Sequence, residues 1–150
     1  MSNGRRRGGR ADMTTTMMIS VGAHALSGLG FLAFAAGFGL RGAWEPWHGE
    51  AVGQPWESLP AELRVVILAI MRAAAAGGLA LAVAIGLLVW RLAQGDAFAI
   101  VALPAVSLTF AIPGAVIAWR FRQRTSANPP LGPAIVGIAV PMVGLIASLL

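Results

Sequence analysis

The amino-acid sequence predicts an all-α integral membrane protein, a four-helix bundle with an interfacial, tryptophan-rich loop between helices 1 and 2. Four long apolar stretches occupy most of its 150 residues: 17–40, 65–90, 97–119 and 133–150. Each contains about 18 residues or more, which is enough to cross the ~30 Å hydrocarbon core of a bilayer as a helix. Composition agrees, because 57% of the residues are hydrophobic and only 11% are charged, against roughly 25% charged in soluble domains.

Composition also removes several classes of function. The chain has no cysteine, which excludes disulfides, thiolate nucleophiles and Cys-ligated metal sites. All basic residues are arginine and the net charge is +5. These arginines lie at the ends of apolar spans, where cations set topology, and no base-stacking surface accompanies them. We therefore expect the lipid bilayer as the main partner, no nucleic acid and no cofactor.

Residues 1–16 form a polar arm with four arginines, and we expect it to be disordered because it has nothing to bury. Met13 and Met17 are plausible alternative translation starts. The following run 17–40 is far longer than the 7–15 apolar residues of a secretory signal. We expect it to remain in the membrane as the first span of a single transmembrane domain, 17–150.

Residues 41–59 are the only sizeable connection, and they collect Trp44, Trp47 and Trp56. Tryptophan is enriched at membrane interfaces, so this loop and the two further tryptophans, Trp90 and Trp119, are predicted to lie at headgroup level. Ser58 is predicted to cap a second helix from about Leu59 to Leu92. That helix would be about 50 Å long, more than one bilayer thickness.

The third span contains two prolines, Pro104 and Pro113, which are predicted to kink its helix and to free backbone carbonyls. We expect Ser107 and Thr109 to satisfy those carbonyls. The arginine-rich arm before the first span favours a cytoplasmic N-terminus, and an even number of spans then makes the C-terminus cytoplasmic.

Arg72 is the only charged residue well inside a predicted span, and two arrangements of it are open. If the hydrocarbon core begins near Ala73, Arg72 extends to the headgroups at the outer boundary. If the core begins at Val65, Arg72 lies about 10 Å deep and needs a polar partner or a water-filled cavity. We favour the boundary arrangement.

Ser20, His24 and Ser27 share one face of the first helix, because they are four and three residues apart. Such a stripe could line a path for protons or small solutes, together with Arg72, Ser107 and Thr109. Interhelical hydrogen bonding is the commoner use of polar residues in membrane helices, and we favour it. His24 and Arg72 are expected to differ in depth by about 10–15 Å, so a shared site is disfavoured.

Two further patterns concern metal binding and packing. Glu45, His48 and Glu50 could form a metal or acid–base cluster, although carboxylates flanking a histidine in a short loop are commonly solvated surface. We therefore predict no metal site. Small residues recur every four positions in the second helix and predict a helix–helix interface, within the chain or with a second protein; they are Ala74, Gly78, Ala82 and Gly86. Gly137 and Gly144 give the fourth span a weaker small face.

The segment PWHGEAVGQPWESLP running into ELRVVILAIMRAAAAGGLALA, with RTSANPP before the last span, resembles the small, uncharacterised four-span proteins of bacterial inner membranes. The resemblance covers about a third of the chain. It implies a membrane class and a location, and it carries no activity onto particular residues. Because no catalytic constellation is present, we expect a non-enzymatic accessory or assembly component of a membrane complex. A small-solute or proton channel or transporter is the alternative.

Overall fold

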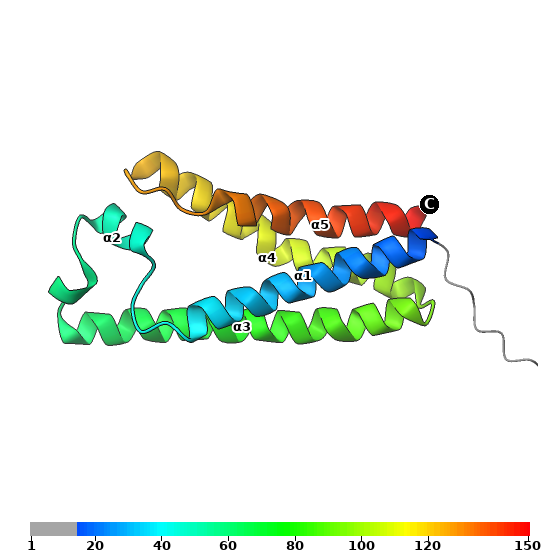
Figure 1. Ribbon diagram of the computed structural model, residues 1–150, viewed down its shortest axis with the longest axis horizontal. Helices are drawn as coiled ribbons and strands as arrows, with labels where there is room; N and C mark the ends of the chain where they lie inside the picture. Colours follow the sequence, from blue (N-terminus) through cyan, green and yellow to red (C-terminus); the bar gives the residue numbers. More distant parts are fainter. Residues whose placement is uncertain (1–14) are drawn as a thin grey trace, which may run out of the picture.

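The computed structural model describes residues 15–150, and this part of the chain is helical without any strand. Four long helices lie side by side, and a short helix with a 3₁₀ turn covers one end (Figure 1). In chain order the elements are α1 (Thr15–Gly39), α2 (Pro46–Val52), η1 (Trp56–Ser58), α3 (Ala61–Ala93), α4 (Ala97–Arg124) and α5 (Leu131–Leu149). Thr15 and Thr16, expected in the arm, begin α1, and residues 1–14 lie outside the described residues.

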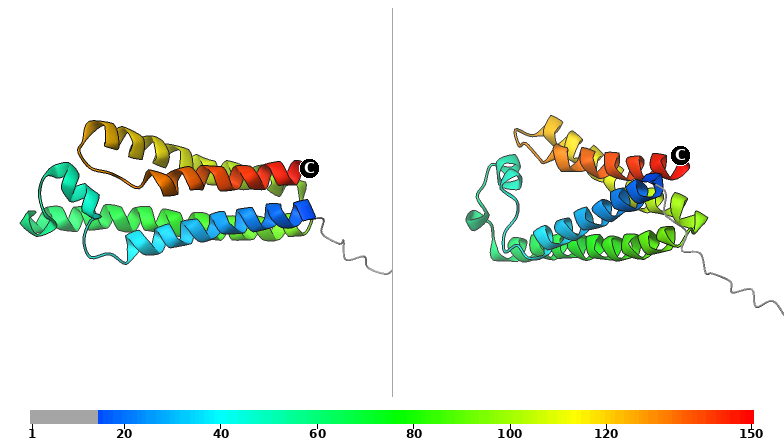
Figure 2. Two further views of the ribbon diagram at one scale, coloured as in Figure 1. Left: turned by 45° about the horizontal axis from the view of Figure 1, so that its top comes forward. Right: turned by 45° about the vertical axis from the view of Figure 1, so that its right-hand side comes forward.

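The four long helices are each long and apolar enough to cross a membrane. This confirms the predicted fold class and the four spans, whose observed bounds differ from the predicted ones by a few residues at most ends. Figures 1 and 2 show that the start of α1 and the end of α5 lie together at the end that carries the α3–α4 connection. We call this the hairpin end. The opposite end, with α2, η1 and the α4–α5 connection, is the loop end.

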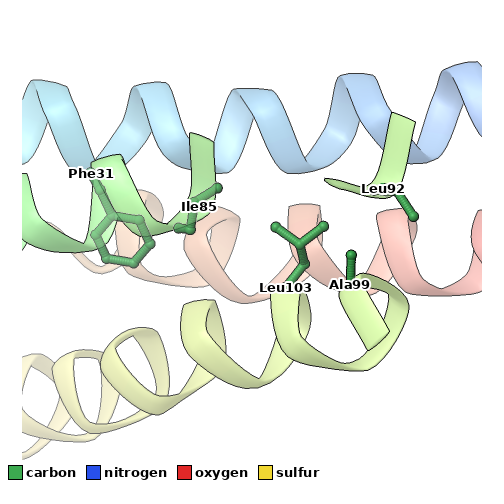
Figure 3. Packing of buried hydrophobic residues seen from close by; sticks show 5 residues of the cluster. All are labelled: Phe31, Ile85, Leu92, Ala99 and Leu103. Carbon is green, nitrogen blue, oxygen red and sulfur yellow. The ribbon is translucent and has the colours of Figure 1, made fainter. Parts of the chain in front are cut away.

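The core depends on α3, which packs most extensively against α1 and also contacts α4. Its buried residues are Met71, Ala75, Gly78, Ile85 and Leu92. They follow each other at intervals of three, four and seven, the repeat of helices that cross at a shallow angle. The main hydrophobic cluster contains Ile85 and Leu92 of α3, Phe31 of α1, and Ala99 and Leu103 of α4; Figure 3 shows Ile85 beside Phe31 and Leu92 at the opposite end of the cluster, towards Ala99. The main hydrophobic cluster thus joins three of the four spans.

Depth in the bundle follows from close approaches between helices. A Cβ added at Gly39, the last residue of α1, would lie 3.3 Å from Ala75 Cβ. Arg72 lies one turn beyond Ala75 towards the loop end, and its side chain is exposed. From residue 72 to Arg91, α3 rises about 28 Å, close to the thickness of a hydrocarbon core. The two arginines therefore stand one core thickness apart, with Arg72 level with the end of α1.

Two local predictions need correction. The second long helix begins at Ala61, and Ser58 does not cap it, because the Ser58 hydroxyl donates to the Pro55 carbonyl oxygen and closes η1 instead (2.8 Å). Pro60, which has no side-chain donor or acceptor, occupies the N-cap position. Beyond Met71, the first turns of α3 extend past the end of α1 and expose Val65 and Ile70.

The hydroxyls of α4 do not satisfy the carbonyls that its prolines free. Pro104 and Pro113 free the carbonyls of residues 100 and 109, four positions earlier. Thr109 instead donates to the Ala105 carbonyl oxygen (2.7 Å), and Ser107 Oγ has no hydrogen-bond partner among the described residues. A helical hydroxyl reaches back three or four residues, so neither position can serve a freed carbonyl.

Candidate functional site

Within residues 15–150, three polar side chains are fully buried in the bundle: Ser20 and His24 on α1 and Ser107 on α4. Ser20 Oγ shares a hydrogen bond with Ser148 Oγ of α5, and Ser148 also donates to the Gly144 carbonyl oxygen (3.0 Å). Ser20 therefore takes part in an interhelical hydrogen bond, the use expected for polar residues in spans. Ser148 was missed in the sequence, although it lies four residues after Gly144 on the same face of its helix.

His24 lies against the backbone of α5. A Cβ added at Gly144 would lie only 2.6 Å from His24 Nε2, so glycine is what allows the imidazole to occupy this position. Neither Nδ1 nor Nε2 has a hydrogen-bond partner among the described residues, and both atoms are buried. Because a buried polar atom without a partner is costly, His24 is the least satisfied side chain of the α1–α5 interface.

Ser107 lies about one to two helical turns from the level of His24. The rings of Phe31 and Phe110 are in edge contact, with centroids 5.4 Å apart. Ser107 precedes Phe110 by three residues, whereas His24 precedes Phe31 by seven. The Phe110 ring contacts Phe34 at the same distance. Since α1 and α4 run in the same direction (Figure 1), the two contacts place Ser107 about 6 to 10 Å from the level of His24 along the bundle. The interior therefore holds two unpartnered polar positions, His24 and Ser107, at neighbouring levels.

The other members of the predicted polar site lie elsewhere. Ser27 is half-buried and donates to the Ala23 carbonyl oxygen of its own helix (3.2 Å), and Thr109 is exposed. Gly28 faces Ile85 and Gly39 faces Ala75, so Arg72 lies about 27 Å from His24 along the bundle. This exceeds the 10–15 Å expected, and the structure does not bring Arg72 and His24 together.

Residues 41–58 at the loop end make contacts with one another and with α4. Arg41 Nε pairs with Glu45 Oε1 (2.9 Å), and the Glu45 backbone N–H donates to His48 Nδ1 (3.1 Å) at the start of α2. Burial lowers the pKa of the His48 imidazole, and the nearby Glu45 carboxylate raises it in part. The Trp47 ring contacts the Phe121 ring of α4 edge-on, with centroids 5.1 Å apart. The loop is therefore attached to α4.

The possible metal cluster of this loop does not form. Glu45 is committed to Arg41, and His48 Nδ1 accepts a backbone hydrogen bond. In residues 15–150, no group of three or more His, Cys, Asp or Glu side chains has the spacing to hold a metal ion. The exposed Glu50 lies on the other side of α2, where it lines a surface hollow.

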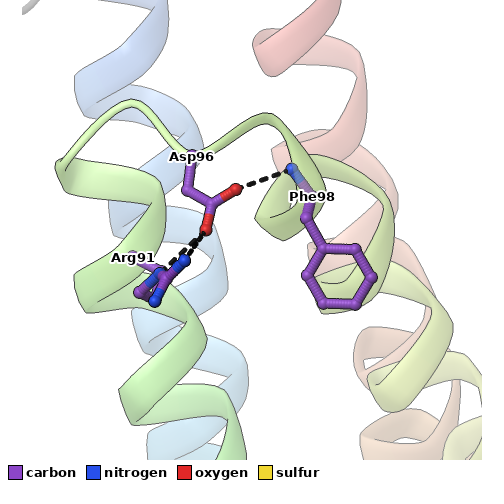
Figure 4. A network of polar contacts seen from close by, with 3 residues as sticks. All are labelled: Arg91, Asp96 and Phe98. Carbon is purple, nitrogen blue, oxygen red and sulfur yellow. Dashed lines mark hydrogen bonds and ion pairs between the residues drawn. The ribbon is translucent and has the colours of Figure 1, made fainter.

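At the hairpin end, the connection between α3 and α4 is held by one carboxylate (Figure 4). Asp96 accepts hydrogen bonds from Arg91 Nε (2.8 Å) and from the Phe98 backbone N–H (3.0 Å), so it both pairs with the end of α3 and caps α4. The hydrogen bond from Arg91 is the largest of the effects that lower the pKa of Asp96. Gly95 has a φ of 81°, which permits the tight turn.

The predicted small-residue stripe is only partly at a contact. Gly78 is buried, and a Cβ there would lie 2.7 Å from Phe34 Cδ1 of α1, while Ala82 packs against the hydrophobic cluster. Ala74 is half-buried, but Gly86 is exposed and has nothing near the position of its missing Cβ. The contact of α3 with α1 lies within the chain.

The five tryptophans occupy both ends of the bundle. Trp44, Trp47 and Trp56 are half-buried in the loop, whereas Trp90 and Trp119 are 61% and 52% exposed on the long helices. Trp90 precedes Arg91 and Trp119 precedes Arg120, which places an aromatic ring next to a cation at each end. This arrangement is typical of membrane interfaces.

Comparison of the chain with protein-family models, curated proteins and solved structures finds no match.

Proposed function

We propose that this multi-pass membrane protein is a non-enzymatic accessory or assembly component of a larger membrane complex, and that it recruits its partner by helix packing. We assign it to the bacterial inner membrane, with both termini in the cytoplasm. The proposal rests on one observation: α3 carries small residues on its exposed side as well as on the side that contacts α1.

The exposed small residues follow one another along α3 and are defined here as the outer small face: Ala69, Ala73, Ala76, Gly77 and Ala80. A Cβ added at Gly77 would meet nothing within 4 Å. Lipid chains gain nothing from small residues, whereas a second helix can approach its backbone closely there and gain van der Waals contact. The outer small face therefore favours a protein neighbour over lipid.

Arg72 supports the same interpretation. It is exposed beside the outer small face, at the edge of the hydrocarbon core, and no ion pair to it occurs within residues 15–150. An arginine at this level can reach headgroups or an acidic residue of a neighbouring protein. It does not line the interior of the bundle, where a transport path would run.

Purification in a mild detergent tests the proposal. We expect the protein to co-purify with a stoichiometric membrane partner, and we expect Ala73→Leu combined with Gly77→Leu to release that partner. Ala139→Leu, at an exposed position on α5, is the matched control and should retain it. A protein that always migrates alone contradicts the proposal. So does a partner that still co-purifies with the Ala73→Leu, Gly77→Leu double variant.

A small-solute or proton path is the second candidate, and the unpartnered nitrogens of His24 favour it. Such a path would use Ser20, His24 and Ser107, without Arg72 and Thr109. A liposome assay with an internal pH dye tests it: the wild type should accelerate proton flux, and His24→Leu should abolish the acceleration. Flux equal to that of empty liposomes would exclude this function.

A further inference from the structure

The loop end carries an open hollow of about 570 Å³ that neither function above uses. Two aromatic rings, Trp44 and Trp56, and two carboxylates, Glu50 and Glu57, lie among its lining residues. The hollow is formed by residues 43–57 alone, beyond the end of α1 (Figure 1). Since α1 ends at the edge of the predicted hydrocarbon core, we expect the hollow to lie at headgroup level.

The two indole rings of the hollow form an open angle. Their centroids are 5.6 Å apart and their planes are inclined by 56°. Gly49 lies beside this pair: a Cβ there would lie 3.5 Å from Trp44 Nε1, an ordinary contact, and 3.2 Å from the Gln54 carbonyl oxygen, which is tighter, so the glycine favours the close approach of residues 49 and 54. Indole faces carry partial negative charge and attract cations, most strongly those with methylated, weakly hydrated ammonium groups.

The carboxylates of the hollow have no cation within the described residues. The ion pairs of residues 15–150 are Arg41 with Glu45 and Arg91 with Asp96. Glu50 and Glu57 are exposed and belong to neither pair. Arg41 is paired with Glu45, and no ion pair joins Arg41 or Arg64, the arginines that flank this loop in sequence, to Glu50 or Glu57. Two carboxylates without an ion pair and two indoles, with no basic residue among the lining residues, give the hollow an acidic and aromatic surface.

We propose that the Trp44–Trp56 hollow binds an organic ammonium cation of the choline type. The indole faces would contact the methyl groups, and Glu50 and Glu57 would supply the counter-charge. The cation can be the headgroup of a lipid in the surrounding membrane or a free solute, because both carry the same ammonium group. This binding would be independent of the partner proposed for the outer small face.

Indole nitrogen–proton resonances of the full chain in phosphatidylglycerol nanodiscs test the inference, with choline chloride as the probe. We expect saturable shifts of the Trp44 and Trp56 signals, with a Kd of about 1 mM, as suits a partly exposed cation–π site. Trp90, at the hairpin end, is the internal reference and should not move. Sodium chloride at equal concentration and the uncharged isostere 3,3-dimethylbutan-1-ol are the ligand controls, and neither should reproduce the shifts.

Variants separate the proposed site from general changes of the loop. Glu50→Gln combined with Glu57→Gln should weaken choline binding at least about fivefold, because the counter-charge is lost. Glu62→Gln, an exposed acid on α3 outside the hollow, should bind like the wild type. An unchanged Trp47 resonance in the double variant shows that the loop is still folded against α4. If this resonance moves, the single variants Glu50→Gln and Glu57→Gln replace the double variant, and each is expected to weaken binding.

The source of the cation follows from repeating the titration in phosphatidylcholine nanodiscs. Weaker apparent binding there means that lipid headgroups occupy the hollow, and equal binding means that a free solute is the ligand; either result supports an ammonium site. The inference is overturned if choline leaves Trp44 and Trp56 unmoved in phosphatidylglycerol. It is also overturned if the uncharged isostere acts equally, or if removal of both carboxylates has no effect.

Discussion

At the scale of single residues, the contact between His24 and Gly144 fixes how closely α1 and α5 approach. Gly144→Ala should destabilise the protein by about 1–3 kcal/mol, because the new methyl group would overlap the buried imidazole. The expected result is a lower midpoint of thermal unfolding in detergent, measured by circular dichroism.

Gly137→Ala on the same helix is the matched control, since a Cβ there would lie 3.7 Å from Ala111 Cβ, an ordinary contact. It should leave the midpoint unchanged or raise it. Combining Gly144→Ala with His24→Ala should cost less than the sum of the single changes, because the clash is gone. Strict additivity would show that the ring and the glycine do not meet.

His48 gives the loop a dependence on pH. Its pKa is lowered from the ordinary value of 6.5, chiefly by burial, so the folded loop favours the neutral ring. The stability it confers is therefore complete above pH 6.5 and is lost as the pH falls through 6.5 towards the lower folded value. A protonated Nδ1 cannot accept the hydrogen bond from the Glu45 N–H.

Hydrogen exchange of the α2 amides measures this effect. After correction for the intrinsic exchange rate, exchange should become faster as the pH is lowered from 7.5 to 5. The carboxylate that acts on the pKa of His48 is that of Glu45, which pairs with Arg41, and Phe121 packs from α4 against Trp47, whose ring contacts His48. His48→Gln should remove the pH dependence. Protection that is the same at both pH values in the wild type would contradict the assignment.

At the scale of elements, the contact face of α3 follows a seven-residue repeat rather than the four-residue spacing visible in the sequence. Gly78→Ala should destabilise the protein by about 1–3 kcal/mol, because the Phe34 ring that it would strike is itself packed against the rings of Phe38 and Phe110. Gly86→Ala should be neutral or stabilising by up to about 1 kcal/mol, since its surroundings are open. Equal losses of stability for Gly78→Ala and Gly86→Ala, measured by thermal unfolding, would contradict the seven-residue repeat and support an interface with four-residue spacing.

The same helix shows what could be predicted from the sequence and what could not. Length and hydropathy are local properties, so the four spans and the length of α3 followed directly from the residues. Contact faces depend on the neighbouring helix. A four-residue step advances about 40° around a helix beyond a full turn, so a stripe from Ala74 to Gly86 moves away from a straight partner, and only Gly78 and Ala82 remain near it.

The candidate polar site illustrates the same limit. Ser20 and His24 were predicted to share a face because their spacing alone places them there. Their partners on α5, Ser148 and Gly144, depend on how α5 is aligned with α1, which no local pattern encodes. Arg72 could be assigned a depth only after Gly39 was found to meet Ala75.

At the scale of the whole molecule, the two ends of the bundle differ in chemistry. The hairpin end has a short, ion-paired turn with Arg91 and Asp96, whereas the loop end combines four tryptophans, three in the loop and Trp119 on α4, with the arginines that end α4. Arg72 lies towards the loop end, and Arg91 stands about 28 Å away along α3. This spacing fits one bilayer and implies that the two ends face opposite compartments.

The absence of cysteine allows a direct test of this arrangement. Single substitutions of three exposed glutamines, Gln54→Cys, Gln94→Cys and Gln123→Cys, place one thiol in each connection or beside it. In intact bacterial cells, a membrane-impermeant maleimide should label the variants at positions 54 and 123, because both lie at the loop end. The variant at position 94 should react only after the membrane is opened, since the hairpin end faces the cytoplasm in the proposed orientation. The reverse labelling would keep the four spans but invert the orientation, whereas equal labelling of all three in intact cells would rule out a four-span bundle.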